Sequence, residues 1–193
     1  MVELVETWGS DDGIAKIARL SHGNKGNSTA TQLIDLLIRL GHDSVFEFAG
    51  ATFYVETPIY VQRQWFRHRT ASYLERSLRY TKLDNIETEH CRLDDIANRL
   101  YSDSVKKSFE TYKKLLDAGV PKEVARSVLP LSTKTSFYVS ANLRSWFNFL
   151  KLRLDKHAQK EIRDEAMQVY THLSNRFPIT MEALNRHRGL LEL

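Results

Sequence analysis

Cysteine is nearly absent from this sequence, since Cys91 is the only one among 193 residues. A single cysteine excludes an intrachain disulfide and any metal site built from several cysteines, and it fits a reducing compartment. Long hydrophobic runs are missing too: the apolar stretches are short, and the N-terminus lacks a basic segment followed by an apolar one. We therefore expect a cytoplasmic protein with no membrane partner.

The motifs that most often bind nucleotides or metals do not occur. There is no GxGxxG and no GxxxxGK[ST], so neither the common dinucleotide-binding unit nor the phosphate loop can explain nucleotide binding. The seven histidines show neither HxxxH nor HExxH spacing, and we expect no metal. No repeat, low-complexity tract or linker divides the chain, so we predict a single domain over residues 1–193.

The net charge of +4 favours anionic ligands without specifying which kind. Residues 63–80 carry five arginines and a histidine, interleaved with aromatic residues and only one carboxylate, Glu75. Arginine matches phosphate oxygens with its fork of N–H donors, and we predict that Ser77 and Arg79 contact one phosphate. A solvated basic face is the alternative. Ser77 has no obvious base beside it in sequence, which disfavours a nucleophilic role but leaves open a base adjacent in space.

Hydrophobic periodicity predicts strands and helices along the whole chain. The predicted strands are 2–9, 49–58 and 133–143. The predicted helices are 11–20, 28–41, 58–68, 94–119, 120–130, 142–155 and 157–177. Expected inward-facing residues are Leu33, Leu36, Leu37 and Leu40 in the second helix and Ile96, Leu100, Phe109, Tyr112 and Leu116 in the fourth.

Helix-terminal signals accompany the first two of these helices. Asp11 or Asp12 is a plausible N-cap for the first, and Ser28 or Thr29 for the second. Gly41 can end the second helix in the left-handed conformation.

Arg153 breaks the amphipathic pattern of the helix predicted over 142–155. Winding at about 100° per residue places it between Trp146 and Phe149, on the side expected to be buried. Burying a charge without a partner is costly, so Arg153 needs a carboxylate, a carbonyl-rich ligand or a phosphate. A structural ion pair, or a packed stem with its head in water, is an equal alternative.

A family signature lies within the arginine-rich stretch. "RHRTASYLERS" places Arg67, His68 and Arg69 seven residues before Ser77, which resembles the RHR-x7-S signature of the flavin-dependent thymidylate synthases. "GHDSVFEF", "PIYVQRQWF", "VPKEVARSVLPL" and "SANLRSWFNFLKLRLDKHAQKEI" resemble further segments of that family, in the family order. The resemblance covers roughly residues 28–175.

This resemblance implies an α+β fold with a central, mainly antiparallel sheet flanked by helices. It implies a homotetramer whose active sites are assembled from several chains, with no nucleic acid partner. It also implies a methyltransferase that binds FAD, takes hydride from NADPH and uses methylenetetrahydrofolate to convert dUMP into dTMP. Family members need no enzyme nucleophile, which agrees with the place of Cys91 outside every matched segment.

The resemblance also implies which residues form the site. The flavin-binding residues would be His42, Ser44, Glu47, Arg67, His68, Arg69, Asn142, Arg144, Asn148 and His157. The dUMP site would comprise Gln64, Arg67, Glu75, Arg76, Ser77, Leu78, Arg79, Arg126 and Arg153. Arg153 and Ser77 would be the catalytic residues, with Arg153 stabilising negative charge that develops on the uracil ring.

Two residues depart from the family pattern. Leu74 stands where asparagine is common, and Phe48 stands where many members have histidine. Because Leu74 lies in the substrate loop, one alternative is a flavin-dependent methylase or hydroxymethylase of another pyrimidine nucleotide. A nucleic-acid-binding module is the alternative from another class, but Glu47, Asn142 and Asn148 would have no role in it.

Overall fold

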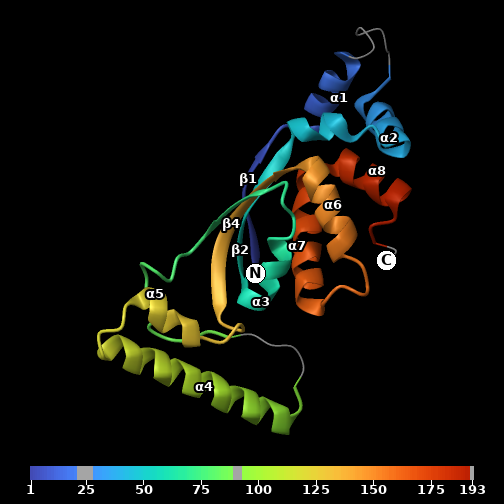
Figure 1. Cartoon of the computed structure of the whole chain (residues 1–193). Coiled ribbons are helices and arrows are strands. Elements are labelled where there is room, and N and C mark those ends of the chain that lie inside the picture. Colours follow the sequence, from blue (N-terminus) through green and yellow to red (C-terminus); the bar gives the residue numbers. More distant parts are fainter. Residues whose placement is uncertain (21–27, 89–92, 192–193) are drawn as a thin grey trace. The chain divides into compact units, whose positions relative to one another are not determined.

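The computed structural model describes residues 1–20, 28–88 and 93–191 (Figure 1), so Cys91 lies outside the described residues. The chain forms two compact units. Unit 1 comprises Met1–Val55, Phe66–Tyr73 and Tyr138–Leu193, and unit 2 comprises Glu56–Trp65 and Leu74–Phe137. Each unit is therefore built from segments that are separated in the sequence.

The strands of the described residues form one sheet in the order β1, β2, β4, β3. They are β1 (Val2–Trp8), β2 (Gly50–Pro58), β3 (Ser72–Glu75) and β4 (Lys134–Asn142). β1 and β2 run antiparallel with Val2 opposite Val55, and the register shifts after Leu4. The α+β class, the antiparallel sheet and all three predicted strands are confirmed, whereas β3 was not predicted.

Helices make up most of the remaining structure. Unit 1 holds α1 (Asp11–Leu20), α2 (Ala30–Leu40), the 3-10 helix η1 (Asp43–Phe48), α6 (Leu143–Arg153), α7 (Lys160–Arg176) and α8 (Pro178–Arg188). Unit 2 holds α3 (Ile59–Trp65), α4 (Asp95–Asp117), α5 (Lys122–Ala125) and the 3-10 helix η2 (Arg126–Val128). In the described residues, no helix combines the length and apolarity needed to span a bilayer.

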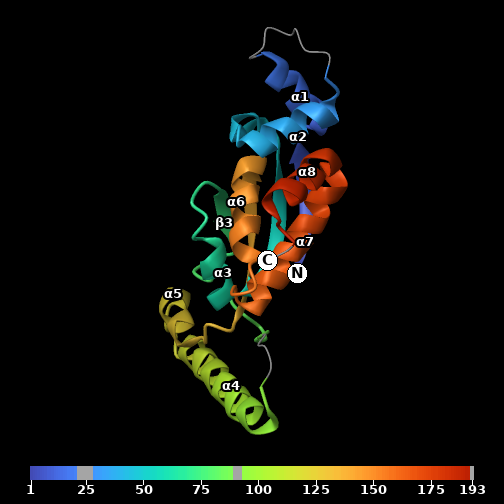
Figure 2. The ribbon, with the colours of Figure 1, turned by 90° about the vertical axis from the view of Figure 1, so that its right-hand side faces the viewer.

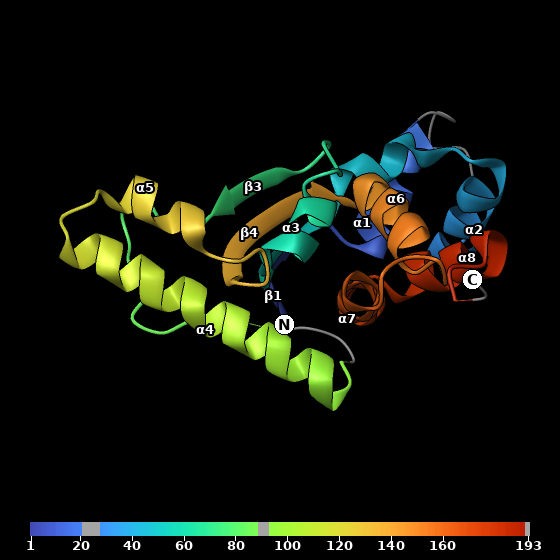
Figure 3. The ribbon, with the colours of Figure 1, turned by 60° about the horizontal axis from the view of Figure 1, so that its bottom comes forward.

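Within each unit, neighbouring helices pack in pairs. In unit 1, α6 and α7 lie side by side (Figure 2), and α7 also packs against β1. In unit 2, α4 runs along α5 (Figure 3). The predicted helix 58–68 is shorter than expected and ends at Trp65, so the RHR motif lies beyond it.

Aromatic rings fill the core of unit 1. Phe53 of β2 and Phe149 of α6 both meet the Trp146 ring edge-on, with centroids 5.1 and 5.6 Å away. The Trp146 Nε1–H donates to the carbonyl oxygen of Ala51 at 3.2 Å, so the polar atom of this buried indole has a partner. Ala51, Phe53 and Val55 are all buried, as the period of two predicted, and burying one phenylalanine stabilises by about 1.5–3 kcal/mol.

The core of unit 2 contains fewer of the predicted residues. Trp65 and Phe137 are buried and pack edge-on with centroids 5.8 Å apart, and Tyr112 of α4 is fully buried. Ile96 and Leu100, predicted to face inward, are exposed. Of the predicted stripe along α4, Tyr112 is buried and Phe109 and Leu116 are half-buried, while the buried Val105 was not predicted. Periodicity does not reveal how much of a helix another element covers.

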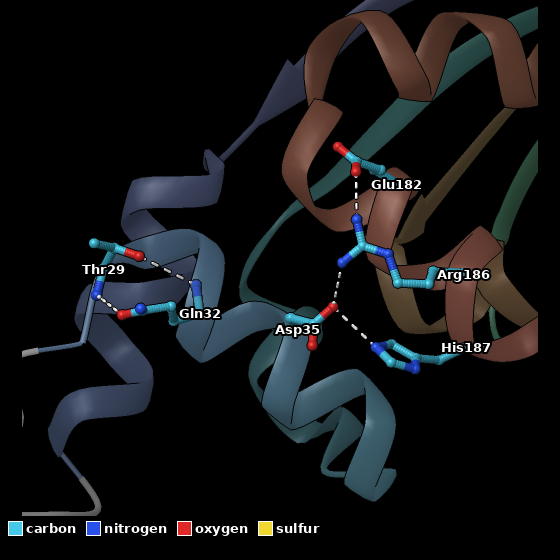
Figure 4. Close-up of polar contacts among 6 residues, drawn as sticks. All are labelled: Thr29, Gln32, Asp35, Glu182, Arg186 and His187. Atoms are coloured by element: carbon cyan, nitrogen blue, oxygen red, sulfur yellow. Dashed lines mark hydrogen bonds and ion pairs between the residues drawn. The ribbon is translucent and has the colours of Figure 1, made fainter.

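α2 begins and ends as its sequence predicts. Thr29 Oγ1 accepts from the Gln32 amide at 3.2 Å, and Gln32 Oε1 accepts from the Thr29 amide at 3.0 Å, which completes a capping box (Figure 4). Gly41 ends the helix in the left-handed conformation, with φ at 74°.

The buried face of α2 differs from the prediction. Leu33 and Leu37 are buried as expected, but Leu36 and Leu40 are exposed, and the other buried residues are Ile34 and Ile38. The reason is that α2 packs against both α1 and α8, so the buried side of α2 includes the isoleucines.

Asp35 ties α2 to α8. Its Oδ1 accepts from Arg186 Nη1 and pairs with His187 Nε2, each at 2.9 Å, and Arg186 also pairs with Glu182 (Figure 4). The hydrogen bond from His187 lowers the pKa of the Asp35 carboxyl, and the positive charges of His187 and Arg186 act in the same direction against desolvation.

Asp11 does not cap α1, contrary to the prediction. Ser10 takes that place, because its Oγ accepts from the Gly13 amide at 3.0 Å. Asp11 is only 8% exposed and accepts from the amides of Ile179 and Thr180 at 2.9 and 3.2 Å. It also accepts from the Thr180 hydroxyl at 2.6 Å. Asp11 therefore caps the first turn of α8, a helix that the sequence analysis missed.

Replacing Asp11 with alanine is expected to lower the free energy of unfolding by about 2 kcal/mol, because the buried amide and hydroxyl of Thr180 lose their acceptor. Urea unfolding of Asp11→Ala beside the wild type measures this change. Asp12→Ala alters the exposed neighbour and should change the free energy by no more than about 0.5 kcal/mol. Equal effects of the two substitutions would contradict the capping role.

Candidate functional site

Unit 2 contains a cavity of about 560 Å³ beside the turn that follows β3. Predicted dUMP-site residues on its wall are Glu75, Arg76, Ser77, Leu78 and Arg126. Other lining residues are Ile59, Glu123, Ser127, Leu129, Leu131 and Thr135. The structure thus brings together residues of the arginine-rich stretch and Arg126, which lies far from them in sequence.

β3 and the turn after it fix the position of Ser77. The Arg76 amide donates to the Ser136 carbonyl at 2.9 Å, which ties the end of β3 to β4. The Ser77 carbonyl accepts from the Thr81 amide at 3.2 Å, and the Ser77 hydroxyl accepts from the Arg79 amide at 3.3 Å. The Ser77 side chain is therefore held at the cavity wall by a hydrogen-bonded turn.

Guanidinium groups give the cavity its donors. Arg76 and Arg126 line it, and Arg79 pairs at 3.4 Å with Glu123 on the wall, where both side chains are 54% exposed. Arg126 Nε also donates to the Glu123 carbonyl oxygen at 3.4 Å. An exposed pair of this kind adds little stability. Together with the Ser77 hydroxyl, the arginines form a donor set suited to a phosphate.

The same cavity also offers an acceptor and an apolar wall. Glu75 Oε1 accepts from the Thr135 hydroxyl at 2.8 Å, which fixes the carboxylate. A carboxylate held in this way can accept hydrogen bonds from hydroxyl or ring N–H groups. Ile59, Leu129 and Leu131 supply apolar surface. This combination suits a small phosphorylated ligand with a ring and hydroxyl groups.

Another cavity, of about 470 Å³, lies in unit 1 and is lined by three predicted flavin-binding residues, Glu47, Arg69 and Asn142. The Asn142 side chain caps the N-terminus of α6. Glu47 Oε1 accepts from Arg144 Nη1 at 2.5 Å, so a fourth predicted residue contacts this group. Trp8 of β1, which the sequence analysis did not single out, is part of the same wall.

The groups on this wall fit a flavin nucleotide. Arg69 is a donor of the kind that binds phosphate, and Glu47 is an acceptor for ribose hydroxyls or ring N–H groups. The hydroxyls of Thr70 and Ser72 add small polar contacts, and the partly exposed ring of Trp8 adds an aromatic face.

Arg153 lies where the helical winding placed it, half-buried at the end of α6. Its Nε–H donates to His68 Nε2 at 3.0 Å, and the His68 ring packs edge-on against Phe149 with centroids 5.0 Å apart. The Tyr73 hydroxyl donates to the His68 carbonyl oxygen at 3.1 Å. One partner of the Arg153 guanidinium is therefore an imidazole. The sequence analysis considered only a carboxylate, a carbonyl-rich ligand or a phosphate.

Burial determines the protonation states in this cluster. Burial lowers the pKa of His68 to about 4, and the positive charge of Arg153 acts in the same direction. His68 is thus neutral near pH 7, as an acceptor must be. Burial raises the pKa of the Tyr73 phenol to about 12, against the opposing effect of Arg153. Burial also lowers the pKa of Arg153, which nevertheless stays charged.

The pKa of His68 predicts that stability falls as the pH drops from 6.5 toward 4. The unfolded chain takes up a proton near the ordinary pKa of 6.5, whereas the folded protein keeps His68 neutral until about pH 4. Protonation of His68 therefore favours the unfolded state between pH 6.5 and pH 4. Above pH 6.5 the imidazole is neutral in both states, and the folded protein has its full stability. Because His68 is only partly buried, we expect a loss of about 1–2 kcal/mol after allowing for solvent screening.

Urea unfolding at pH 7 and pH 4.5 measures this loss for the wild type. His68→Gln should lack this part of the pH dependence, because glutamine keeps an acceptor but does not titrate. If the free energy of unfolding changes equally between the two pH values in both proteins, groups other than His68 cause the pH dependence.

Several predicted site residues line neither of these two cavities. Asn148 lines a further cavity of unit 1, of about 610 Å³, together with Lys151 and Arg188. Elsewhere in unit 1, the exposed residues are His42 and Ser44 at the start of η1, Arg67, and His157, which pairs with Asp155. In unit 2, Gln64 is half-buried in α3.

Among the residues of these sites that the sequence analysis missed are Trp8, Tyr73, Glu123 and Thr135. Three of them lie on strands, where their residue types are ordinary, and Glu123 lies in a short helix. No pattern marked them, because their importance comes from neighbours distant in sequence. Among residues 1–20, 28–88 and 93–191, no cluster of histidine, cysteine and acidic side chains is arranged to hold a metal ion.

Comparisons with known proteins extend over nearly the whole chain. Residues 3–179 match the family model described as thymidylate synthase complementing protein. A flavin-dependent thymidylate synthase of Pseudothermotoga lettingae is 41% identical over 204 residues, covering 97% of this chain and 90% of the relative. One from Thermus thermophilus is 38% identical over 205 residues, covering 96% and 76%.

A solved structure is also similar. The crystal structure of the UMP/dUMP methylase PolB from Streptomyces cacaoi, bound with 5-Br dUMP, matches with a TM-score of 0.86. Its sequence is 32% identical, and the match covers 96% of this chain and 94% of that one.

Proposed function

Because the chain belongs to the flavin-dependent thymidylate synthase family, we propose that it is a methyltransferase that converts dUMP into dTMP. FAD would be its cofactor, methylenetetrahydrofolate its one-carbon donor and NADPH its reductant, and the reaction would supply dTMP in the cytoplasm. The observation that carries the proposal is the cavity of unit 2, where Arg76, Ser77 and Arg126 converge.

That cavity is our candidate site for the phosphate of dUMP. Arg76, Arg126 and the Ser77 hydroxyl would donate to the phosphate oxygens, with Arg79 exchanging its bond to Glu123 for the ligand. The remaining proposed contacts are Gln64, Arg67, Glu75 and Leu78.

The cavity of unit 1 is our candidate site for the flavin. Glu47, Arg69 and Asn142 on its wall would hold the cofactor. The other proposed contacts are His42, Ser44, Arg67, His68, Arg144, Asn148 and His157. Bound flavin would supply the reducing equivalents for the methylation.

Arg153 would act on the pyrimidine ring. Methylation at C5 requires negative charge to develop on the ring, and a fixed guanidinium stabilises such charge better than mobile water does. Ser77 would orient the nucleotide from the phosphate side. We further propose that residues 1–193 form one synthase domain and that four copies assemble. In such a family tetramer the residues of one active site need not come from one protomer.

A mass-spectrometric assay for dTMP tests the proposal. The purified protein is incubated with FAD, NADPH, dUMP and methylenetetrahydrofolate, and each component is omitted in turn. We expect dTMP only in the complete mixture. Folded protein that retains flavin yet forms no dTMP would refute the choice of substrate or of one-carbon donor.

UMP is a second candidate substrate. The solved structure that resembles this chain is of a UMP/dUMP methylase, and Leu74, where asparagine is common in the family, is 71% exposed on β3. Measuring kcat/KM for UMP and dUMP side by side decides between them. A ratio far above one in favour of dUMP would exclude UMP as the main substrate.

A further inference from the structure

Arg153 is oriented through the segment Phe66–Tyr73 of unit 1. The bond at 3.0 Å joins Arg153 Nε–H to His68 Nε2. All N–H donors of a guanidinium lie in one plane, so a partner on Nε–H restricts the direction of that whole plane. The orientation of Arg153 therefore depends on where the His68 ring is held.

One contact to the His68 ring and one to its main chain fix the position of the imidazole. It packs edge-on against Phe149, which lies four residues before Arg153 on the same face of α6. The main chain of His68 is held separately, because its carbonyl oxygen accepts from the Tyr73 hydroxyl at 3.1 Å. Imidazole and guanidinium are thus positioned by the same helix.

The Tyr73 side chain is held in place by a neighbouring aromatic ring, and its hydroxyl stays a donor. Its ring contacts the Phe66 ring with centroids 4.5 Å apart, which brings the two ends of Phe66–Tyr73 together. Its high pKa keeps the phenol protonated, and thus a donor, at every pH at which an enzyme of this kind would work. A neutral His68 and a protonated Tyr73 are the states that both hydrogen bonds require.

We propose that His68 and Tyr73 are positioning residues for Arg153, with His68 accepting from the guanidinium Nε–H and Tyr73 holding the main chain of His68. The proposal rests on the function proposed above, since Arg153 is taken to act on the pyrimidine. It assigns a role to Tyr73, which has none in the proposed function. It also assigns His68 a role in addition to its proposed contact with flavin. Small displacements of a reacting group lower the rate steeply, so loss of the Tyr73 hydroxyl should be visible in kcat.

Tyr73→Phe tests the kinetic consequence, because it removes one oxygen and keeps the ring. We expect kcat to fall about 10-fold while KM for dUMP changes less than about twofold, since binding contacts remain. Flavin absorbance and melting temperature should stay near wild-type values. The control is Tyr170→Phe, a half-buried tyrosine of α7 outside the cluster, which should leave kcat unchanged.

A double substitution separates positioning from general damage. An Arg153→Lys background lacks the planar guanidinium whose direction the bond to His68 sets, so adding Tyr73→Phe should lower kcat little further. Fully multiplicative losses in the double variant, or an unchanged kcat in Tyr73→Phe alone, would overturn the proposal.

Nitrogen-15 NMR of histidine side chains gives a readout that does not depend on activity. We expect the His68 signal, identified by its loss in His68→Gln, to show a neutral ring with its proton on Nδ1 at pH 7. A proton on Nε2, or a charged ring, would overturn the proposal even in an active enzyme. If the wild type forms no dTMP but shows the expected tautomer, the proposed function fails and the arrangement around Arg153 stands.

Discussion

Arg153→Ala is expected to lower kcat for dTMP formation about 1,000-fold, the upper range for losing one preorganised group that stabilises developing charge. KM for dUMP should change much less, because the proposed phosphate contacts of Arg76, Ser77 and Arg126 are unaltered. Flavin absorbance should be retained, and the protein should stay folded, because truncation removes a half-buried charge together with its desolvation cost. Steady-state kinetics and flavin absorbance on one preparation measure kcat, KM and flavin retention.

Two further variants sharpen this test. Arg153→Lys keeps the charge but loses the planar fork, so its kcat should lie between those of alanine and the wild type. Lys16→Ala removes an exposed positive charge from α1 of the same unit and should leave kcat unchanged. Turnover by Arg153→Ala at the wild-type rate would exclude the guanidinium from the chemistry.

Arg126→Ala is expected to raise KM for dUMP about 100-fold with little change in kcat, because a charge-assisted bond to phosphate is worth about 1.5–3 kcal/mol. Titration of dUMP against the variant and the wild type measures this. Arg99→Ala, at an exposed arginine of α4 in the same unit, is the control and should bind dUMP normally.

Deoxyuridine, which lacks the phosphate, separates the role of Arg126 from a general loss of structure. If Arg126 contacts the phosphate, the wild type and Arg126→Ala should bind the nucleoside equally weakly. A variant that loses affinity for deoxyuridine as well would point to a damaged cavity. A variant with normal affinity for dUMP would show that the phosphate binds elsewhere.

Local signals in the sequence predicted local structure well. The capping box from Thr29 to Gln32 and the left-handed Gly41 were both readable, because a helix terminus is determined by residues within four positions of it. The half-burial of Arg153 followed from helical winding alone. The strand around Phe53 followed from its period of two.

Contacts between distant residues could not be predicted from one sequence. Asp11 looked like a cap for its own helix, but its carboxylate caps α8, more than 160 positions away. β3 is too short, at four residues, to show a period. Nothing in the sequence revealed that a Cβ at Gly50 would lie 2.3 Å from the Trp8 ring and 2.4 Å from the Ala141 carbonyl oxygen, which leaves no room for a larger residue.

The residues of the candidate site also divide into those that the sequence identified and those whose contacts only the fold reveals. Family motifs named Arg76, Ser77 and Arg126, and the structure gathers them on one wall. The motif also named His68, but only the folded structure shows that His68 accepts a hydrogen bond from Arg153. Tyr73 stood out only as one of the aromatic residues interleaved with the arginines, and a tyrosine on a strand is usually explained by packing.

The two units have a consequence for how this chain could have evolved. The chain crosses between them four times, after Val55, Trp65, Tyr73 and Phe137, so neither unit is encoded by one continuous stretch. An exchange of one contiguous stretch of sequence cannot transplant either unit without also carrying residues of the other. A chimaera of two relatives with one crossover inside residues 56–137 would therefore combine parts of both parents in each unit.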